Sequence, residues 1–131
     1  MKVLALDYGA ARTGVAVSDA TGTIARPLGV VERAASPPGL ARIAELVHEE
    51  GVERVVVGLP LTLRGERGAQ ARATEEFVRA LRASVDVPVE TYDERFTTAL
   101  AGADVSTSAP EDARAAAHLL EGYLRRLDRA R

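Results

Sequence analysis

The chain has 131 residues, of which 47% are hydrophobic and 27% are charged, proportions typical of an ordinary globular domain. It contains no cysteine, which excludes disulfides and thiolate metal sites, and no apolar run approaches the roughly 20 residues of a membrane span. The net charge of −2 favours neither an acidic nor a basic partner, and the N-terminus has no leader pattern. We therefore expect one cytoplasmic domain over residues 1–131, with no membrane association.

The N-terminal segment predicts a β-hairpin whose first strand ends on an acid. Residues 3–6 form an uninterrupted apolar run, which is typical of a central strand covered on both faces. Asp7 closes this run, and burial of a carboxylate there is costly unless a cation or hydrogen-bond donors meet it. Residues 8–13 form a short turn, and residues 14–17 return as the second strand of an antiparallel pair.

The central part of the chain predicts alternating strands and helices. Residues 23–32 form a third strand, in which Pro27 lacks a backbone donor and so indicates a sheet edge or a bulge. The apolar spacing then predicts a helix, a buried strand, a polar loop with glycines, a second helix and a last strand, at residues 38–50, 55–57, 61–68, 68–84 and 87–92. Because a hairpin leads into right-handed crossovers, we expect an α/β fold with a five-stranded mixed sheet of order 3-2-1-4-5, flanked by helices.

The C-terminal part of the chain predicts one long helix. Residues 97–103 favour a short helix, and residues 104–107 favour a loop. Ser108 and Glu111 have the spacing of a capping box, with the serine at the N-cap and the glutamate three residues later. The last helix is expected to run from this box to about residue 128.

Four acids are expected at the ends of these elements. Asp7 closes the central strand, Asp93 and Glu94 follow the last strand, and Asp112 lies in the first turn of the last helix, on the face of its apolar residues. Each acid alone has an ordinary explanation: a turn former, an ion pair with Arg95, or a favourable charge at a helix N-terminus. Together they would repel one another unless cations were present, so they predict a site for Mg²⁺ or Mn²⁺, with two ions expected.

Arginines and glycines lie close to these acids in the sequence. Arg64 and Arg67 stand in the glycine-bearing loop, where they could bind phosphate through two hydrogen bonds each. Arg12 follows Asp7, and Arg95 follows the acidic pair, so both could extend a phosphate-contacting rim. The alternative is that the loop is an ordinary surface connection and that Arg12 and Arg95 form internal ion pairs.

Four motifs occur in order: LDYGAARTGVAVSD at residues 6–19, VGLPL at 57–61 followed by Gly65 and Gly68, DERFTT at 93–98, and Asp112 followed by paired alanines, paired leucines and Tyr123. With these motifs the chain resembles the YqgF family, also called RuvX, of Holliday-junction resolvases and pre-16S ribosomal RNA nucleases. The resemblance implies an RNase H-like fold, divalent-metal nuclease chemistry and often a homodimer. The matching positions imply Asp7, Glu94 and Asp112 as catalytic acids and metal ligands, with Asp93 as a further candidate ligand.

We therefore expect a nuclease that hydrolyses phosphodiester bonds in structured nucleic acid, either branched DNA or precursor ribosomal RNA. Arg12, Arg64, Arg67 and Arg95 are its expected nucleic-acid contacts. Two alternatives remain. One is a non-catalytic nucleic-acid-binding or assembly module with the same fold. The other is a phosphotransferase of the actin and sugar-kinase type, for which the chain looks too short to form two lobes.

Overall fold

The computed structural model describes residues 1–62, 64–96 and 109–130, and the side chain of Phe96 is not described. The short helix predicted at residues 97–103, the loop predicted at 104–107 and the predicted cap residue Ser108 lie outside the described residues.

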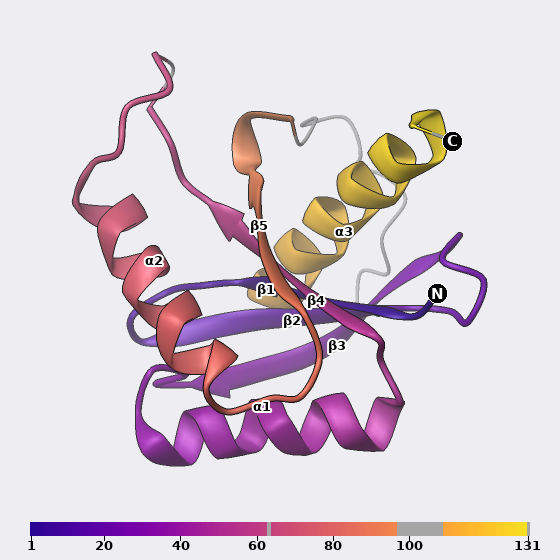
Figure 1. The fold of residues 1–131 in the computed structure, drawn as a ribbon, viewed down its shortest axis with the longest axis horizontal. Helices are drawn as coiled ribbons and strands as arrows, with labels where there is room; N and C mark the ends of the chain where they lie inside the picture. Colours follow the sequence, from indigo (N-terminus) through magenta and orange to yellow (C-terminus); the bar gives the residue numbers. More distant parts are fainter. Residues whose placement is uncertain (63, 97–108, 131) are drawn as a thin grey trace.

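Within the described residues, five strands form one sheet in the order β3-β2-β1-β4-β5 (Figure 1). The strands are β1 (Val3–Asp7), β2 (Arg12–Ser18), β3 (Ala25–Glu32), β4 (Arg54–Leu59) and β5 (Val89–Asp93). Strand β1 pairs antiparallel with β2 and parallel with β4, and β4 pairs parallel with β5. The predicted mixed sheet and its strand order are therefore confirmed.

Strand β3 has both features that Pro27 indicated. It lies at the edge of the sheet, and its pairing with β2 shifts register between Val15 and Ala16. Val15 lies opposite Gly29 and Ala16 lies opposite Pro27, so one residue of β3 has no partner in the ladder. The proline therefore occurs where a missing backbone donor costs little.

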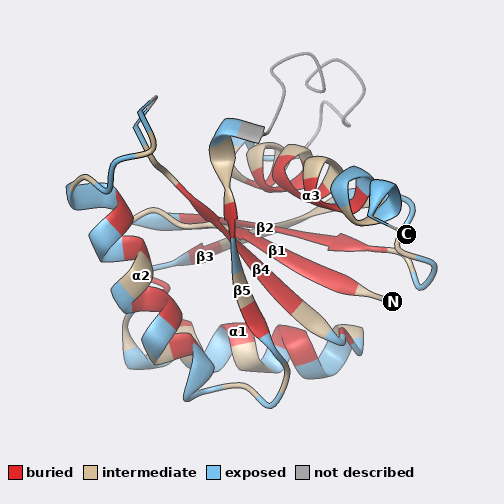
Figure 2. Ribbon diagram, turned by 45° about the horizontal axis from the view of Figure 1, so that its top comes forward, coloured by how far each residue is buried: buried red, intermediate tan, exposed pale blue. Residues whose placement is uncertain are grey.

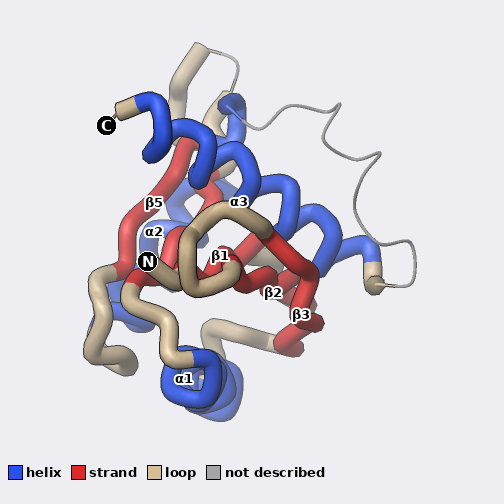
Figure 3. The backbone as a smooth tube through the Cα atoms, turned by 90° about the vertical axis from the view of Figure 1, so that its right-hand side faces the viewer, coloured by secondary structure: helices blue, strands red, loops and turns tan. Residues whose placement is uncertain are grey.

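The helices cover the two faces of the sheet (Figures 1 and 3). They are α1 (Pro37–Glu50), α2 (Ala69–Arg82), the short 3₁₀ helix η1 (Glu94–Phe96) and α3 (Glu111–Arg129). Apolar side chains of α1 and α2 join one core cluster, and those of α3 join a second cluster on the opposite face. Of the helices in the described ranges, none combines the length and apolar character needed to cross a bilayer.

The residues at the helix ends predicted the limits of α1 correctly but not the start of α3. Ser36 caps α1, because its hydroxyl accepts a hydrogen bond of 3.2 Å from the backbone of Gly39, and Gly51 ends the helix with φ of 65°. Helix α3 differs from its prediction, since Pro110 and not Ser108 occupies its N-cap position and makes no side-chain cap. A residue that precedes proline is disfavoured in helical geometry, and this delays the helix until after Pro110.

Strand β1 is buried from both sides (Figure 2). Leu4 and Leu6 pack in the cluster with α1 and α2, whereas Val3 and Ala5 pack in the cluster with α3. Because successive side chains of a strand alternate between faces, Asp7 follows Val3 and Ala5 onto the face that α3 covers. The apolar alternation of the core thus determines the side of the sheet on which the first acid lies.

A polar network fixes the C-terminal half of α3 on the sheet. Arg54 of β4 donates to the Tyr123 hydroxyl at 2.7 Å and pairs with Glu90 of β5 at 3.2 Å, and Tyr123 also donates to Glu90. Burial, with the contact to Glu90, raises the pKa of Tyr123 to about 12, so the hydroxyl keeps its proton and donates it. The network thus links α3 to both β4 and β5 through polar contacts.

Candidate active site

Asp7 and Glu94 meet at the carboxyl ends of β1 and β5, on the face covered by α3. Strand β5 ends at Asp93, and η1 then turns Glu94 back over Gly58 of β4. A Cβ atom at Gly58 would lie 2.6 Å from the Glu94 carboxyl oxygen Oε1 and 3.0 Å from a methyl group of Leu119. The absence of a side chain at Gly58 therefore makes the space that Glu94 occupies, and there Glu94 shares a hydrogen bond with Asp7.

The environment raises the proton affinity of both carboxyl groups. Burial raises the pKa of Asp7, and the negative charge of Asp112 raises it further, although the hydrogen bond with Glu94 acts in the opposite direction. For Glu94, burial and then repulsion by Asp7 raise the pKa from its usual 4.5 to about 7. Two carboxyl groups this close can share one proton, but they repel each other once both ionise.

Asp112 reaches the same edge of the sheet from α3. The first turn of α3 lies directly on β2, since a Cβ atom at Gly14 would be only 1.8 Å from the backbone oxygen of Asp112. Gly14 is the residue of β2 that lies opposite Asp7, so this contact brings Asp112 towards Asp7. The Asp112 side chain is 41% exposed and pairs with Arg12, with 3.4 Å between Nε and Oδ2. It lies at the rim of the core rather than within it.

Asp93 differs from the other three acids. Its carboxylate accepts hydrogen bonds from Arg95, the shortest being 2.6 Å from Nη2, and this contact holds its pKa below the usual range. The Arg95 guanidinium in turn lies against Gly65, where a Cβ atom would meet Nη1 at 3.4 Å. Asp93 is therefore engaged in positioning Arg95, and Glu94 is the member of the pair that faces Asp7.

The four candidate arginines lie in different surroundings. Arg12 and Arg95 form the ion pairs that were the alternative interpretation of these residues, with Asp112 and Asp93 respectively. Arg67 pairs with Glu75 of α2 at 3.0 Å, and Arg64 is exposed. Ion pairs with an exposed member are weak, so a phosphate group could displace them. Arg12 and Arg95 each contact one of the acids, which places two cations beside the candidate site.

The carboxylate oxygens of Asp7, Glu94 and Asp112 are suitable ligands for a divalent cation, although the three groups do not surround one point. Among the residues that the structure describes, no three Asp, Glu, His or Cys side chains are spaced to hold one ion together. Asp7 and Glu94 are in contact, and Asp112 is near enough to raise the pKa of Asp7 while its own carboxylate faces Arg12. Carboxylates that repel a neighbouring carboxylate, as Asp112 repels Asp7 and Asp7 repels Glu94, are the groups whose repulsion Mg²⁺ or Mn²⁺ would relieve.

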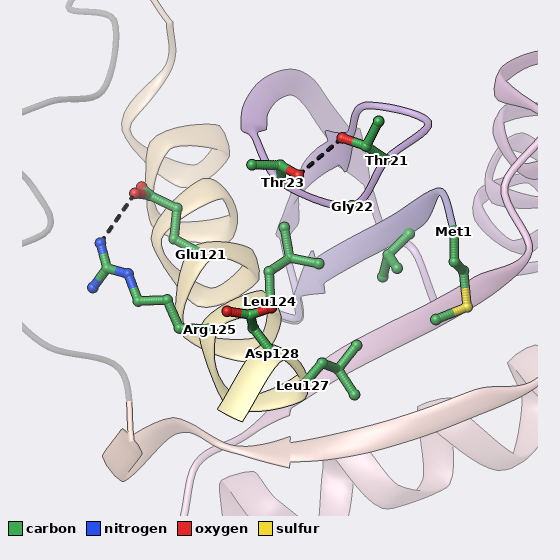
Figure 4. A pocket seen from close by; sticks show the side chains of 10 residues that line it. Met1, Thr21, Gly22, Thr23, Glu121, Leu124, Arg125, Leu127 and Asp128 are labelled. Carbon is green, nitrogen blue, oxygen red and sulfur yellow. Dashed lines mark hydrogen bonds and ion pairs between the residues drawn. The ribbon is translucent and has the colours of Figure 1, made fainter. Parts of the chain in front are cut away.

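A pocket of about 320 Å³ lies away from these acids (Figure 4). It lies between the turn that joins β2 to β3, where Thr21 and Thr23 line it, and the C-terminal part of α3, where Leu124 and Asp128 line it. Val3 also lines it, at the start of β1, whereas Asp7 ends that strand. The pocket and the acids are therefore at opposite ends of β1.

The raised pKa of Glu94 predicts a pH-dependent stability in the absence of metal. Between about pH 4.5 and 7, the folded protein holds a proton on Glu94 that the unfolded chain releases. The free energy of unfolding should therefore fall as the pH rises through this window, and the raised pKa of Asp7 acts in the same direction. Thermal unfolding in EDTA at several pH values measures the effect. The Glu94→Gln variant should lose most of this slope, and an unchanged slope would contradict the assignment.

Sequence reasoning missed the two glycines that build the site. Gly58 and Gly14 lie within strands, and neither has the positive φ of a turn glycine. A glycine in the interior of a strand indicates a bulge or a close approach by another group, and this signal was available in the sequence. What it could not provide was the identity of the approaching groups, which are the Glu94 side chain and the backbone of Asp112.

Comparison with solved structures identifies the class of the fold. The chain is similar to Thermus thermophilus RuvC, with a TM-score of 0.63 to RuvC in complex with a Holliday junction substrate and 0.60 to a second RuvC structure. In each case 96% of both chains is covered at 22% identity, a level that shows the fold alone. The fold is RNase H-like, as predicted.

Comparison of sequences identifies the family. A family model described as "RuvX: Holliday junction resolvase" matches residues 1–126. Relatives described as "Putative pre-16S rRNA nuclease" occur in Moorella thermoacetica, at 42% identity over 97% of this chain and 96% of the relative, and in Rubrobacter xylanophilus, at 46% over 94% and 91%. A relative from Chloroflexus aurantiacus with the same description is 52% identical over 76% of this chain, and the match spans 65% of that relative's length. The chain belongs to the RuvX family, which confirms the resemblance.

Proposed function

We propose that this protein is a divalent-metal-dependent nuclease that hydrolyses phosphodiester bonds in structured nucleic acid. The observation that carries the proposal is the contact between the Asp7 and Glu94 carboxyl groups, with Asp112 close enough to raise the pKa of Asp7. Without a cation this arrangement costs folding free energy, so stability alone gives no reason for it. Membership of a family described as a Holliday junction resolvase supports the same activity.

Asp7, Glu94 and Asp112 would hold the cations, with Asp7 between the other two. Bound Mg²⁺ or Mn²⁺, in the two-ion arrangement, supplies the positive charge that activates a water and stabilises the leaving oxygen of a phosphodiester. The chain itself contributes the position of each carboxylate. Gly58 leaves space for Glu94, Gly14 lets α3 bring Asp112 close, and β1 holds Asp7 at its end.

The arginines would orient the nucleic-acid backbone. We assign Arg12 and Arg95 to phosphates beside the acids, and Arg64 and Arg67 to the backbone further along, from the loop between β4 and α2. In this proposal Asp93 positions Arg95 rather than binding an ion. The arginine fork matches the oxygens of a phosphate, which supports a nucleic-acid substrate over a small neutral one.

Two substrates fit the proposal: a DNA four-way junction, which the family description names, and precursor 16S ribosomal RNA, which the relatives' descriptions name and which we expect to be cut in its 5′ part. Both have a dense phosphate backbone in folded geometry, so the acids and arginines fit both equally. The homodimer that the family resemblance implies belongs to the same proposal, since a symmetric junction presents two equivalent strands.

The test is to compare cleavage of both substrates under identical conditions. Labelled four-way junction and precursor 16S RNA fragments are incubated with the purified protein and Mn²⁺, with Mg²⁺ or EDTA in parallel. We expect cuts in at least one substrate, dependent on the metal and absent with the Asp7→Asn variant. Binding without cleavage under every metal would instead favour a nucleic-acid-binding or assembly module, and specific ATP binding in calorimetry would favour a phosphotransferase.

A further inference from the structure

The Arg12–Asp112 ion pair lies at the rim of the candidate active site, and both of its side chains are exposed. Arg12 Nε lies 3.4 Å from Asp112 Oδ2, with 67% of the arginine side chain and 41% of the aspartate side chain exposed. An ion pair with this much access to water contributes little to stability, because solvent screens it and both side chains must be ordered. It can therefore exchange partners at small cost.

The backbone of Asp112 is fixed much more firmly than its carboxylate. The packing of the first turn of α3 on Gly14 fixes the backbone, since a Cβ atom at that glycine would lie 1.8 Å from the Asp112 carbonyl oxygen. The side chain, in contrast, is oriented by its contact with Arg12. Rotation of the side chain alone can thus change which cation the carboxylate meets, with no movement of the helix.

The carboxylates of the described residues fall short of a complete metal site. Asp7 and Glu94 already touch, and Asp112 raises the pKa of Asp7, yet no three acids in the described part of the chain are spaced for one ion. The third carboxylate is the one that faces an arginine. Arg12 supplies one positive charge to a carboxylate to which a divalent ion would supply two.

We propose that Arg12 and the divalent ion compete for the Asp112 carboxylate. In the metal-free protein Arg12 holds Asp112, whereas in the metal-bound protein Asp112 turns to the ion and Arg12 is released to contact a nucleic-acid phosphate. Arg12 then couples metal binding to substrate binding. The inference rests on the proposed nuclease function, because it requires an ion at Asp7 and Glu94.

The first test measures metal affinity in the absence of substrate. Calorimetric titration with Mn²⁺ should give the Arg12→Gln variant at least about a threefold tighter dissociation constant than the wild type, since one competitor for Asp112 is gone. Arg26→Gln is the matched control: Arg26 is a similarly exposed arginine that pairs with Glu50 near the opposite end of the β2–β3 pair, so its loss should leave Mn²⁺ affinity unchanged. The Arg12→Lys variant should lie between wild type and Arg12→Gln.

The second test measures junction binding in EDTA, where cleavage is absent. Asp112→Asn should strengthen binding of a fluorescent four-way junction by about threefold or more, because Arg12 is then available to a phosphate. This gain should disappear in the Arg12→Gln/Asp112→Asn double variant. Glu111→Gln removes an equal charge from the neighbouring exposed position and should give a smaller gain, which persists when Arg12 is also replaced.

The outcomes separate the two proposals. Asp7-dependent Mn²⁺ binding that is unchanged or weakened by Arg12→Gln would overturn the exchange and leave the nuclease assignment intact. Failure of the wild type to bind Mn²⁺ in an Asp7-dependent way would overturn both. Because Arg12 is exposed, its replacement should leave the melting temperature close to that of the Arg26→Gln control, so loss of folding does not complicate the comparison.

Discussion

The Asp7→Asn variant should lose metal-dependent cleavage by about a thousandfold, with its fold intact. Asparagine has nearly the shape of aspartate, so the packing at the end of β1 is preserved, but it carries no charge to attract a cation. Asp7 is also the acid that both of the others meet, through its contact with Glu94 and its repulsion by Asp112. Cleavage rates at saturating Mn²⁺ measure the loss, and circular dichroism checks the fold.

The same substitution should stabilise the metal-free protein at pH 8. At that pH Asp7 and Glu94 are both ionised, since burial and repulsion raise the pKa of Glu94 only to about 7. Asp7→Asn removes the repulsion, and after allowance for partial exposure we expect a gain of about 1 kcal/mol in the free energy of unfolding. This corresponds to a melting temperature higher by about 4 °C in EDTA at pH 8, with little difference at pH 5.

A variant that loses activity while gaining stability would mark Asp7 as a functional rather than a structural residue. Addition of Mn²⁺ should reverse the order, because the ion stabilises only the wild type by binding its folded state. Retained cleavage in Asp7→Asn would remove the catalytic assignment. Loss of both cleavage and stability would show instead that Asp7 is needed for folding.

The fold was predictable because its main determinants are local patterns. The apolar run before Asp7 indicated a strand covered on both faces, and the structure buries residues 3–6 completely. Pro27 indicated an edge or a bulge and has both, and Gly51 ends α1 as predicted. The start of α3 was less predictable, because two local signals compete there. The capping-box spacing favours a start after Ser108, whereas Pro110 disfavours helical geometry in the residue before it. The sequence does not show which of the two effects is stronger.

For the site, the sequence predicted which acids lie at the end of a strand or the start of a helix, but not which side chains face one another. The strand order places Asp7 and Glu94 at one edge of the sheet, and this follows from topology. Whether Asp93 or Glu94 faces Asp7 depends on how η1 turns, and the sequence left that open. Asp112 was expected to point with the core residues of α3, but the strands end beneath this turn, so its carboxylate reaches the rim and meets Arg12. Ion pairs between distant segments have no sequence signature.

Among glycine-to-alanine substitutions in the described part of the chain, we expect Gly14→Ala to cost the most folding stability. The added Cβ would lie 1.8 Å from the carbonyl oxygen and 2.3 Å from the carbonyl carbon of Asp112, and these backbone atoms cannot be relieved by a change of rotamer. The start of α3 must therefore move away from β2. We expect a loss of about 3 kcal/mol in the free energy of unfolding, the upper range for overpacking, measured by urea denaturation.

Gly29→Ala provides the matched control for Gly14→Ala. Gly29 lies in the neighbouring strand and nothing lies within 4 Å of its added Cβ, so the same chemical change should alter the free energy of unfolding by less than about 0.5 kcal/mol. If α3 yields easily in Gly14→Ala, the stability loss will be smaller, but Asp112 will then move away from Asp7 and Mn²⁺ affinity will fall. A Gly14→Ala protein as stable and as strongly metal-binding as Gly29→Ala would contradict the close contact, and with it the route by which α3 brings the third acid to the site.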